Sequence, residues 1–229
     1  MKYQWLLFDA DGTLFDYDRA EAHALSESFA QIGYPFEEKY LSEYRHINGS
    51  LWQAFEQGGI NQNRLKVERF ELLCQAFGLT LNPTLLSQLY LENLACGTFL
   101  IDGAEETLKA LINHYNLAII TNGLKDVQRP RIASSSIHSY FPVIVISEEV
   151  GAAKPDKKIF DIAFQRMGDP QREEVLIIGD SLTSDIAGAL NYGIDSCWFN
   201  PGRQQRPVGL NIRYEIDALN DLIGLLNVS

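Results

Sequence analysis

The sequence has few cysteines, a deficit of positive charge and no long hydrophobic run. Its three cysteines, Cys74, Cys96 and Cys197, are odd in number and far apart, so free thiols are expected rather than a disulfide framework or a zinc site. The formal net charge of −11 over 229 residues argues against a nucleic-acid partner, because binding a phosphate backbone needs a basic surface. The apolar run Trp5–Phe8 is far too short for a membrane span or a signal peptide. We therefore expect a cytoplasmic protein with neither a nucleic-acid nor a membrane partner.

Several common catalytic signatures are also missing. The sequence contains no G-x-x-x-x-G-K-[ST] segment, which excludes a P-loop, and no G-x-S-x-G nucleophile elbow. The four histidines, His23, His46, His114 and His138, are isolated from one another, which favours surface or packing roles over catalysis. The chemistry must therefore be sought among other residue types.

Short apolar runs separated by helical patterns predict an α/β fold. The predicted strands cover residues 4–8, 117–120, 143–146, 175–178 and 196–199. Runs without polar alternation are typical of parallel strands that are buried on both faces. Helical patterns over 104–114, 157–167 and 184–192 separate most of them, so we predict a Rossmann-like, doubly wound parallel sheet.

About a hundred residues between the first two strands carry no comparable strand signal. Apolar residues recur there at helical spacing over 18–33, 36–45, 51–56, 61–77 and 84–94. Turn residues separate these segments, as at Gly58-Gly59 and Asn82-Pro83. We predict an all-helical domain, residues 17–98, inserted into an α/β core formed by residues 1–16 and 99–229.

Polar side chains suited to chemistry follow the predicted strands. They are Asp9 and Asp11 after the first strand, Thr121 and Asn122 after the second, Lys154 a short loop after the third, and Asp180 and Asp185 after the fourth. In an open parallel sheet, ligands bind beyond the carboxyl ends of the strands. We therefore expect these side chains to converge in one cleft.

The three carboxylates Asp9, Asp11 and Asp180 predict a magnesium site. Two like charges one residue apart repel each other unless a cation lies near them, and Mg²⁺ prefers hard oxygen ligands while bridging to a substrate phosphate. With the charge neutralised, Asp9 could attack phosphorus to form an aspartyl-phosphate. Asp11 could protonate the leaving oxygen and later deprotonate the attacking water.

The remaining polar residues suit a phosphate-binding role. The Thr121 hydroxyl and the amide of Asn122 could hold two phosphate oxygens, and Lys154 adds the positive charge that phosphoryl transfer needs. Asp185 is expected to anchor a metal-bound water or Lys154 from outside the metal's ligand shell. Taken singly, each short signal is also explained by a turn or a helix cap. Their joint occurrence in order, each at a predicted strand end, favours a site.

The segments DADGTL, TNG, AAKP and GDSLTSD, in that order, resemble the motifs of the haloacid dehalogenase-like hydrolase superfamily over essentially the whole chain. The resemblance implies that Asp9 is the nucleophile and Asp11 the acid and base. It implies that Thr121 and Lys154 bind phosphate and balance charge. The implied Mg²⁺ ligands are Asp9, Asp180 and the main-chain carbonyl of Asp11. The inserted helical domain corresponds to the family's first cap type, which is expected to close over the substrate and exclude water.

Longer segments resemble the pyrimidine 5'-nucleotidase branch of this superfamily. They are FDADGTLFDYD, INGSLWQAFEQGGI followed by LKVERFELL, TNGLKDVQRPRI, and VISEEVGAAKPDKKIFDIA. The resemblance implies a phosphatase for small phosphorylated substrates such as UMP, dUMP and dTMP. A sugar-phosphate phosphatase or a phosphomutase of the same superfamily stays open as an alternative. A phospho-ligand-binding domain without turnover is the non-enzymatic alternative, although both Asp9 and Asp11 are present.

One segment departs from a regular helical pattern. Pro130 falls inside the helix expected over 124–137, where a proline removes one backbone hydrogen bond and favours a kink. The run Ser134-Ser135-Ser136 weakens the helix further. We therefore expect an irregular or displaced helix at this point.

Overall fold

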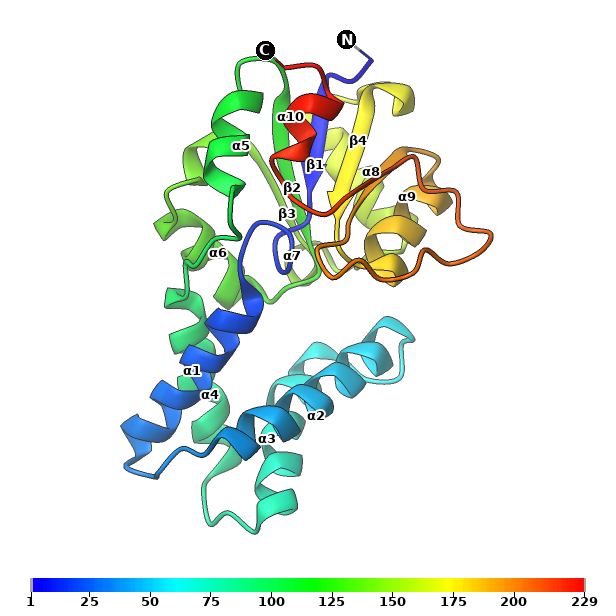
Figure 1. The fold of residues 1–229 in the computed structure, drawn as a ribbon. Helices are drawn as coiled ribbons and strands as arrows, with labels where there is room; N and C mark the ends of the chain where they lie inside the picture. Colours follow the sequence, from blue (N-terminus) through cyan, green and yellow to red (C-terminus); the bar gives the residue numbers. More distant parts are fainter. Residues whose placement is uncertain (1, 229) are drawn as a thin grey trace. The chain divides into compact units, whose positions relative to one another are not determined.

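The computed structural model describes residues 2–228 and divides into two compact units (Figure 1). The core unit comprises the N-terminal segment to Tyr17, Phe99–Lys125 and the chain from Ile132 onward. The helical unit comprises Asp18–Thr98 together with Asp126–Arg131. That residues 17–98 form a cap of the first type stays a prediction.

A six-stranded parallel sheet forms the centre of the core unit. Its strands are β1 (Trp5–Phe8), β2 (Asn116–Thr121), β3 (Val143–Ile146), β4 (Val175–Gly179), β5 (Asp195–Phe199) and β6 (Tyr214–Ile216), in the order β3-β2-β1-β4-β5-β6. The prediction of a parallel α/β sheet is confirmed. Sequence reasoning missed β6, because this edge strand has three residues, of which only Ile216 is buried. The strand order reverses between β1 and β4, which is where open α/β sheets bind ligands.

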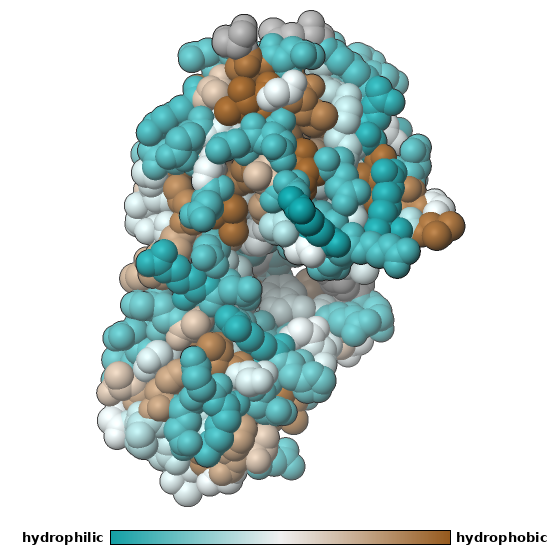
Figure 2. All heavy atoms as spheres, in the orientation of Figure 1, coloured by the Kyte–Doolittle hydropathy of each residue, from teal (hydrophilic) through white to brown (hydrophobic). Residues whose placement is uncertain are grey.

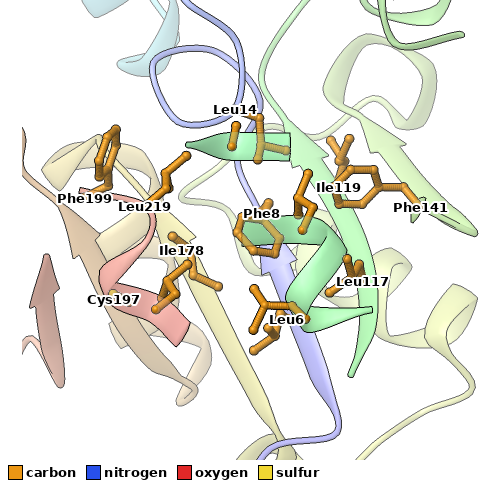
Figure 3. Packing of buried hydrophobic residues seen from close by; sticks show 14 of the residues in the cluster. Leu6, Phe8, Leu14, Leu117, Ile119, Phe141, Ile178, Cys197, Phe199 and Leu219 are labelled. Carbon is orange, nitrogen blue, oxygen red and sulfur yellow. The ribbon is translucent and has the colours of Figure 1, made fainter. Parts of the chain in front are cut away.

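Successive residues of the central strands enter two different cores. Leu6 and Phe8 of β1 pack in the core on one face of the sheet, whereas Leu7 packs in the core on the other. Figure 3 shows the first core, in which Leu117 and Ile119 lie near Phe8. Because both faces are covered, the central strands are apolar over most of their length, as the sequence runs predicted.

Helices cover both faces of this sheet. The helices of the chain from residue 104 onward are α5 (Ala104–Leu111), α6 (Lys125–Ser134), α7 (Ser147–Val150), α8 (Lys157–Met167), α9 (Ala187–Tyr192) and α10 (Asp221–Leu225). α5 and α10 contribute Leu108 and Leu222 to the first core, and α8 and α9 contribute Phe160 and Tyr192 to the second. The Phe160 and Tyr192 rings stack with their centroids 5.2 Å apart.

Four helices account for most of the helical unit. They are α1 (Tyr17–Ile32), α2 (Glu38–Glu56), α3 (Gln62–Phe77) and α4 (Pro83–Cys96). The side chains of Asn61 and Asn82 accept hydrogen bonds from the first-turn amides of α3 and α4, and Gly78 ends α3 in the left-handed conformation. Two separate helices were expected over 36–45 and 51–56, but α2 is continuous. Residues 46–50 continue this helix, with Ile47 buried inside the unit.

The helix that was expected to be irregular or displaced at Pro130 is not interrupted there. α6 runs as an α-helix from Lys125 to Ser134 through Pro130, and it ends three residues earlier than predicted. Proline removes the hydrogen bond to the carbonyl four residues earlier, here that of Asp126, the second residue of the helix. Since only Lys125 precedes Asp126 in α6, the missing hydrogen bond lies near the N-terminal end of the helix.

Charged side chains lie mainly on the surface. Hydrophilic residues cover most of the face seen in Figure 2. Within residues 2–228 no helix combines the length and the apolar character that a membrane span needs. Cys74 and Cys197 are buried free thiols and Cys96 is an exposed one, as expected for a chain without disulfides. Buried charges are therefore the exceptions, and three of them lie together beyond the carboxyl end of the sheet.

Candidate active site

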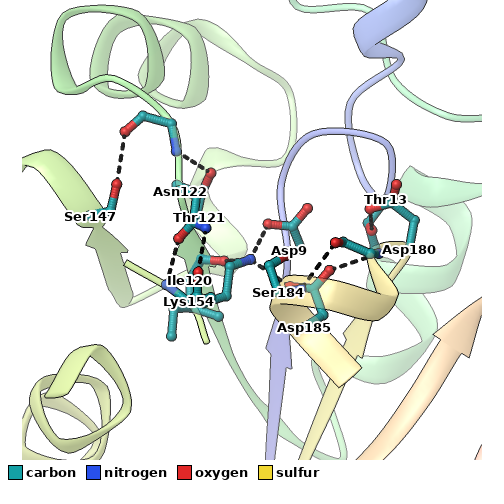
Figure 4. A network of polar contacts seen from close by, with 12 residues as sticks. Asp9, Thr13, Ile120, Thr121, Asn122, Ser147, Lys154, Asp180, Ser184 and Asp185 are labelled. Atoms are coloured by element: carbon teal, nitrogen blue, oxygen red, sulfur yellow. Dashed lines mark hydrogen bonds and ion pairs between the residues drawn. The ribbon is translucent and has the colours of Figure 1, made fainter. Parts of the chain in front are cut away.

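The predicted site residues come together beyond the carboxyl ends of the central strands (Figure 4). Asp9 directly follows β1, Thr121 is the last residue of β2, and Asp180 directly follows β4. Lys154 reaches the same place from the loop after α7, and Asp185 from the turn after β4. The parallel direction of the strands brings these five residues to one edge.

Lys154 is the only buried lysine among the described residues, at 1% exposure, and it lies between two carboxylates. Its ammonium group donates to the Asp9 carboxylate, to Asp185 Oδ1 at 2.6 Å and to the carbonyl of Ile120 at 2.8 Å. An ammonium group has three donors, so three protein acceptors engage all of them. The fixed ammonium orients Asp9 through its Oδ1 atom. A phosphate contact of Lys154 stays a prediction.

Asn122 holds the main chain of Lys154. Its Oδ1 accepts from the Lys154 N–H at 2.7 Å, and its Nδ2 donates to the Lys154 carbonyl at 2.8 Å. The side-chain amide thus pairs with both main-chain groups of one residue. Any phosphate contact of Asn122 therefore falls to its main-chain N–H. The neighbouring Thr121 is buried, and its hydroxyl accepts from the Gly123 N–H at 3.2 Å.

A π-helical turn places Asp185. Sequence reasoning predicted a regular helix over 184–192, but Leu182–Ile186 forms a π-helix in which the Ile186 N–H donates to the Ser181 carbonyl at 3.1 Å. Such wide turns are frequent at functional sites. The fully buried Asp185 accepts from Lys154 through Oδ1 and from the Ser181 N–H through Oδ2, at 3.1 Å. Both of its oxygens are therefore engaged by the protein, and its supporting role beside a metal stays a prediction.

The Asp180 carboxylate is confined by the loop after β1. Thr13 is fully buried, and its hydroxyl donates to Asp180 Oδ1 at 3.2 Å. Gly12 has a φ of +79°, and a Cβ there would lie 2.6 Å from Asp180 Oδ2. Sequence reasoning missed Thr13. The only signal for Thr13 was its place in the D-x-D-G-T run, which does not reveal which side chain it contacts.

The donor set at this edge fits a hard divalent cation. Oxygens of Asp9, Asp180 and Asp185 lie within 4.8 Å of one another. Since Asp185 already uses both oxygens, Asp9 and Asp180 are the carboxylates best placed to bind an ion. The half-buried Asp11 carboxylate is outside the acidic group found in the described chain. A role for Asp11 in metal binding therefore stays a prediction for its main-chain carbonyl.

Burial and mutual repulsion shift the pKa values of these groups. Burial raises the pKa of Asp9 well above its usual range, and Asp185 and Asp180 add to this rise while Lys154 opposes it. Burial and Asp185 raise the pKa of Asp180 from 3.8 to about 7. Burial alone would lower the pKa of Lys154, but Asp185 and Asp9 raise it above its ordinary value. Lys154 therefore stays protonated, and the surplus negative charge favours either a proton or a cation at the site.

Comparison with known proteins finds relatives that are named as hydrolases or nucleotidases. The sequence model described as haloacid dehalogenase-like hydrolase matches residues 6–199. Pyrimidine 5'-nucleotidase YjjG of Escherichia coli is 35% identical and covers 99% of each chain, and pyrimidine 5'-nucleotidase PynA of Streptococcus pneumoniae is 35% identical, covering 99% of this chain and 96% of its own. The crystal structure of the HAD-hydrolase YfnB of Bacillus subtilis, described as bound to magnesium, superposes with a TM-score of 0.94 at 37% identity and covers 100% of both chains.

Asp180→Asn should stabilise the protein at alkaline pH when no metal is present. The pKa of Asp180 rises to about 7 in the folded chain, so between pH 4 and 7 the folded state binds more protons than the unfolded state. Stability from this group is therefore lost as the pH rises through that window. Asparagine does not ionise. In EDTA, we therefore expect the melting temperature of the Asp180→Asn variant to exceed that of wild type at pH 8 and to approach it at pH 5.

The measurement is a calorimetric melt of both proteins across this pH range. Asp102→Asn serves as the control, because Asp102 is exposed and its replacement should leave the pH dependence unchanged. A melting temperature for Asp180→Asn that stays below wild type at pH 8 would contradict the repulsion inferred for this carboxylate.

Gly179→Ala should destabilise the core unit. A Cβ at the last residue of β4 would lie 2.3 Å from the Asp185 carboxylate, so either the π-helical turn or the strand must move. We expect a loss of about 1–3 kcal/mol, the usual cost of overpacking, together with loss of activity. Urea denaturation measures the free energy of unfolding. Gly224→Ala in α10 is the matched control, since nothing lies within 4 Å of its added Cβ. Equal stability of the two variants would contradict the tight approach of Asp185 to β4.

Proposed function

Because the chain belongs to the haloacid dehalogenase-like hydrolase family, we propose that it is a Mg²⁺-dependent phosphatase that removes the 5'-phosphate of pyrimidine nucleoside monophosphates. The observation that carries this proposal is the group of Asp9, Lys154, Asp180 and Asp185 at the end of the parallel sheet, in which all but Asp180 are buried. The two relatives named as pyrimidine 5'-nucleotidases support the substrate class. The magnesium in the described structure of YfnB supports the choice of cation.

Asp9 acts as the nucleophile in this proposal. Lys154 holds its Oδ1, which leaves Oδ2 to approach phosphorus, and the side chain retains 10% exposure. Attack forms an aspartyl-phosphate and breaks the bond between phosphorus and the 5'-oxygen of the nucleoside. Asp11 gives its proton to the departing oxygen, and the nucleoside leaves neutral.

Water then hydrolyses the aspartyl-phosphate. Asp11, now ionised, takes a proton from the water as its oxygen attacks phosphorus, and the bond to Asp9 breaks. Inorganic phosphate leaves, and both carboxyl groups return to their starting states. Throughout, the Thr121 hydroxyl and the main-chain N–H of Asn122 orient the phosphoryl oxygens, and Lys154 keeps its charge.

Asp9, Asp180 and the main-chain carbonyl of Asp11 would hold Mg²⁺. When bound, the cation supplies positive charge that offsets the carboxylates and the phosphoryl oxygens. Asp185 supports the site from outside this ligand set by holding Lys154 and the Ser181 N–H. The raised pKa of Asp180 fits a residue that awaits a cation.

We assign residues 17–98 to the family's helical cap, and residues 1–16 and 99–229 to the catalytic core. The cap would close over the substrate and exclude bulk water during the reaction. The description of the YfnB structure reports interdomain movement in that protein, which supports a cap that moves. The net charge of −11 favours a small phosphorylated substrate over a nucleic acid, and a nucleotide substrate fits a cytoplasmic location.

Asp9→Asn should abolish phosphate release while preserving the fold. The substitution keeps the shape of the side chain and removes the carboxylate that attacks phosphorus. We would compare phosphate release from dTMP with Mg²⁺ for wild type, Asp9→Asn and the control Asp102→Asn, with circular dichroism as the measure of folding. Release by wild type and Asp102→Asn alone is the expected result. Substantial turnover by folded Asp9→Asn would rule out the covalent route. Phosphate release by wild type from sugar phosphates alone would contradict the nucleotide substrate and favour a sugar-phosphate phosphatase.

Asp11→Asn should slow both steps and allow the phosphorylated enzyme to accumulate with a good leaving group. An activated aryl phosphate needs no proton at its leaving oxygen, so the first step proceeds while the second lacks its base. Intact-protein mass spectrometry after rapid acid quenching would detect one added phosphoryl group on this variant and none on Asp9→Asn. Full dTMP activity of Asp11→Asn would remove the residue from the acid and base role.

A further inference from the structure

The indole of Trp198 is bonded to the main chain of Asp180. Trp198 lies in β5, is 1% exposed, and donates from Nε1 to the Asp180 carbonyl at 2.9 Å. Ile186 and Ile212 form a small apolar cluster with it, and Leu182 and Leu210 pack against this cluster. An indole N–H in apolar surroundings is costly unless it finds an acceptor. The bond to Asp180 therefore fixes the position of the ring as well as that of the carbonyl.

The hydrogen bond from Trp198 to Asp180 lies just beyond the last paired residues of β4 and β5. Gly179 and Trp198 are the last residue pair of the β4 and β5 ladder, and Asp180 is the first residue beyond β4. The Trp198 side chain thus reaches past the end of this pairing and holds the next carbonyl group. Fixing that peptide plane limits the directions that the Asp180 side chain can take from its Cα atom.

Trp198 acts on a different part of Asp180 than the β1 loop does. Thr13 donates to the carboxylate, and Gly12 passes close to it, whereas Trp198 holds the main chain. These contacts oppose the electrostatic repulsion between the carboxylates, because oxygens of Asp9, Asp180 and Asp185 lie within 4.8 Å of one another. Like charges at this separation favour rotation of the more exposed group toward water.

We propose that Trp198 is a positioning residue for the cation site, and that its N–H raises the affinity for Mg²⁺ without touching ion or substrate. The restraint is established on folding, so the carboxylate needs less ordering when a cation binds. This inference rests on the proposed function, in which Asp180 is a Mg²⁺ ligand. It predicts a change in metal affinity when the N–H is removed and the ring shape is kept.

The test replaces Trp198 site-specifically with β-(3-benzothienyl)alanine, which keeps the bicyclic ring but has no N–H donor. Trp198→Phe gives a second variant without the donor. Mn²⁺ alone, titrated into metal-free protein and followed by the electron paramagnetic resonance of the free ion, gives the dissociation constant without any turnover. We expect it to rise about fivefold in both variants, as for loss of one neutral hydrogen bond. The KM for dTMP at saturating Mg²⁺ should stay near the wild-type value.

Ile212→Val is the matched control, because it trims the same apolar cluster without touching the indole N–H. Its Mn²⁺ affinity should equal that of wild type. Wild-type affinity in the benzothienyl variant, or an equal loss in Ile212→Val, would overturn the positioning role and leave the proposed function intact. Failure of wild-type protein to bind either Mn²⁺ or Mg²⁺ would overturn both.

Discussion

The buried ammonium of Lys154 is the interaction on which the site depends. Burying Asp9 and Asp185 is costly unless each finds a partner of opposite charge, and Lys154 contacts both. That arrangement requires the loop after α7 to deliver the lysine to the end of β2, where the Ile120 carbonyl takes its third donor. The side-chain amide of Asn122 secures the same loop by pairing with the main chain of Lys154. The orientation of the Asp9 carboxylate, the proposed nucleophile, is thus set by contacts that link four segments far apart in the sequence.

Main-chain features position the acidic groups as much as side chains do. The left-handed conformation of Gly12 lets the chain pass close to Asp180, and Gly179 leaves space for Asp185 because it has no Cβ. The π-helical turn at Leu182–Ile186 carries Asp185 back toward β4. Each of these features is less favourable locally than a regular strand or helix, and each lies within the site. Their concentration there indicates that local stability is sacrificed where carboxylates must be held close together.

The sequence was informative where a pattern is local, and uninformative where a contact is tertiary. The five apolar runs identified β1 to β5, and the polar residues that follow them reach one edge because parallel strands all end there. β6 was not predicted, because a three-residue edge strand with one buried residue leaves no apolar run in the sequence. The break expected between residues 45 and 51 was wrong, since α2 is continuous there with Ile47 buried. No spacing rule reveals that Trp198 reaches the Asp180 carbonyl, because the two residues meet only after β4 and β5 pair.

The proposed function requires an acidic chain to bind an anionic nucleotide, and this needs positive charge at the point of binding. Lys154 alone does not supply enough, since Asp9, Ile120 and Asp185 already engage its three donors and two of these partners are anions. With Asp180 included, three carboxylates face one ammonium group. A phosphate dianion would add to this surplus unless a cation entered with it or before it. The same surplus that raises the pKa of Asp180 favours a cation at the site, and in the proposed function cation binding is the step that turns this acidic edge into a phosphate-binding one.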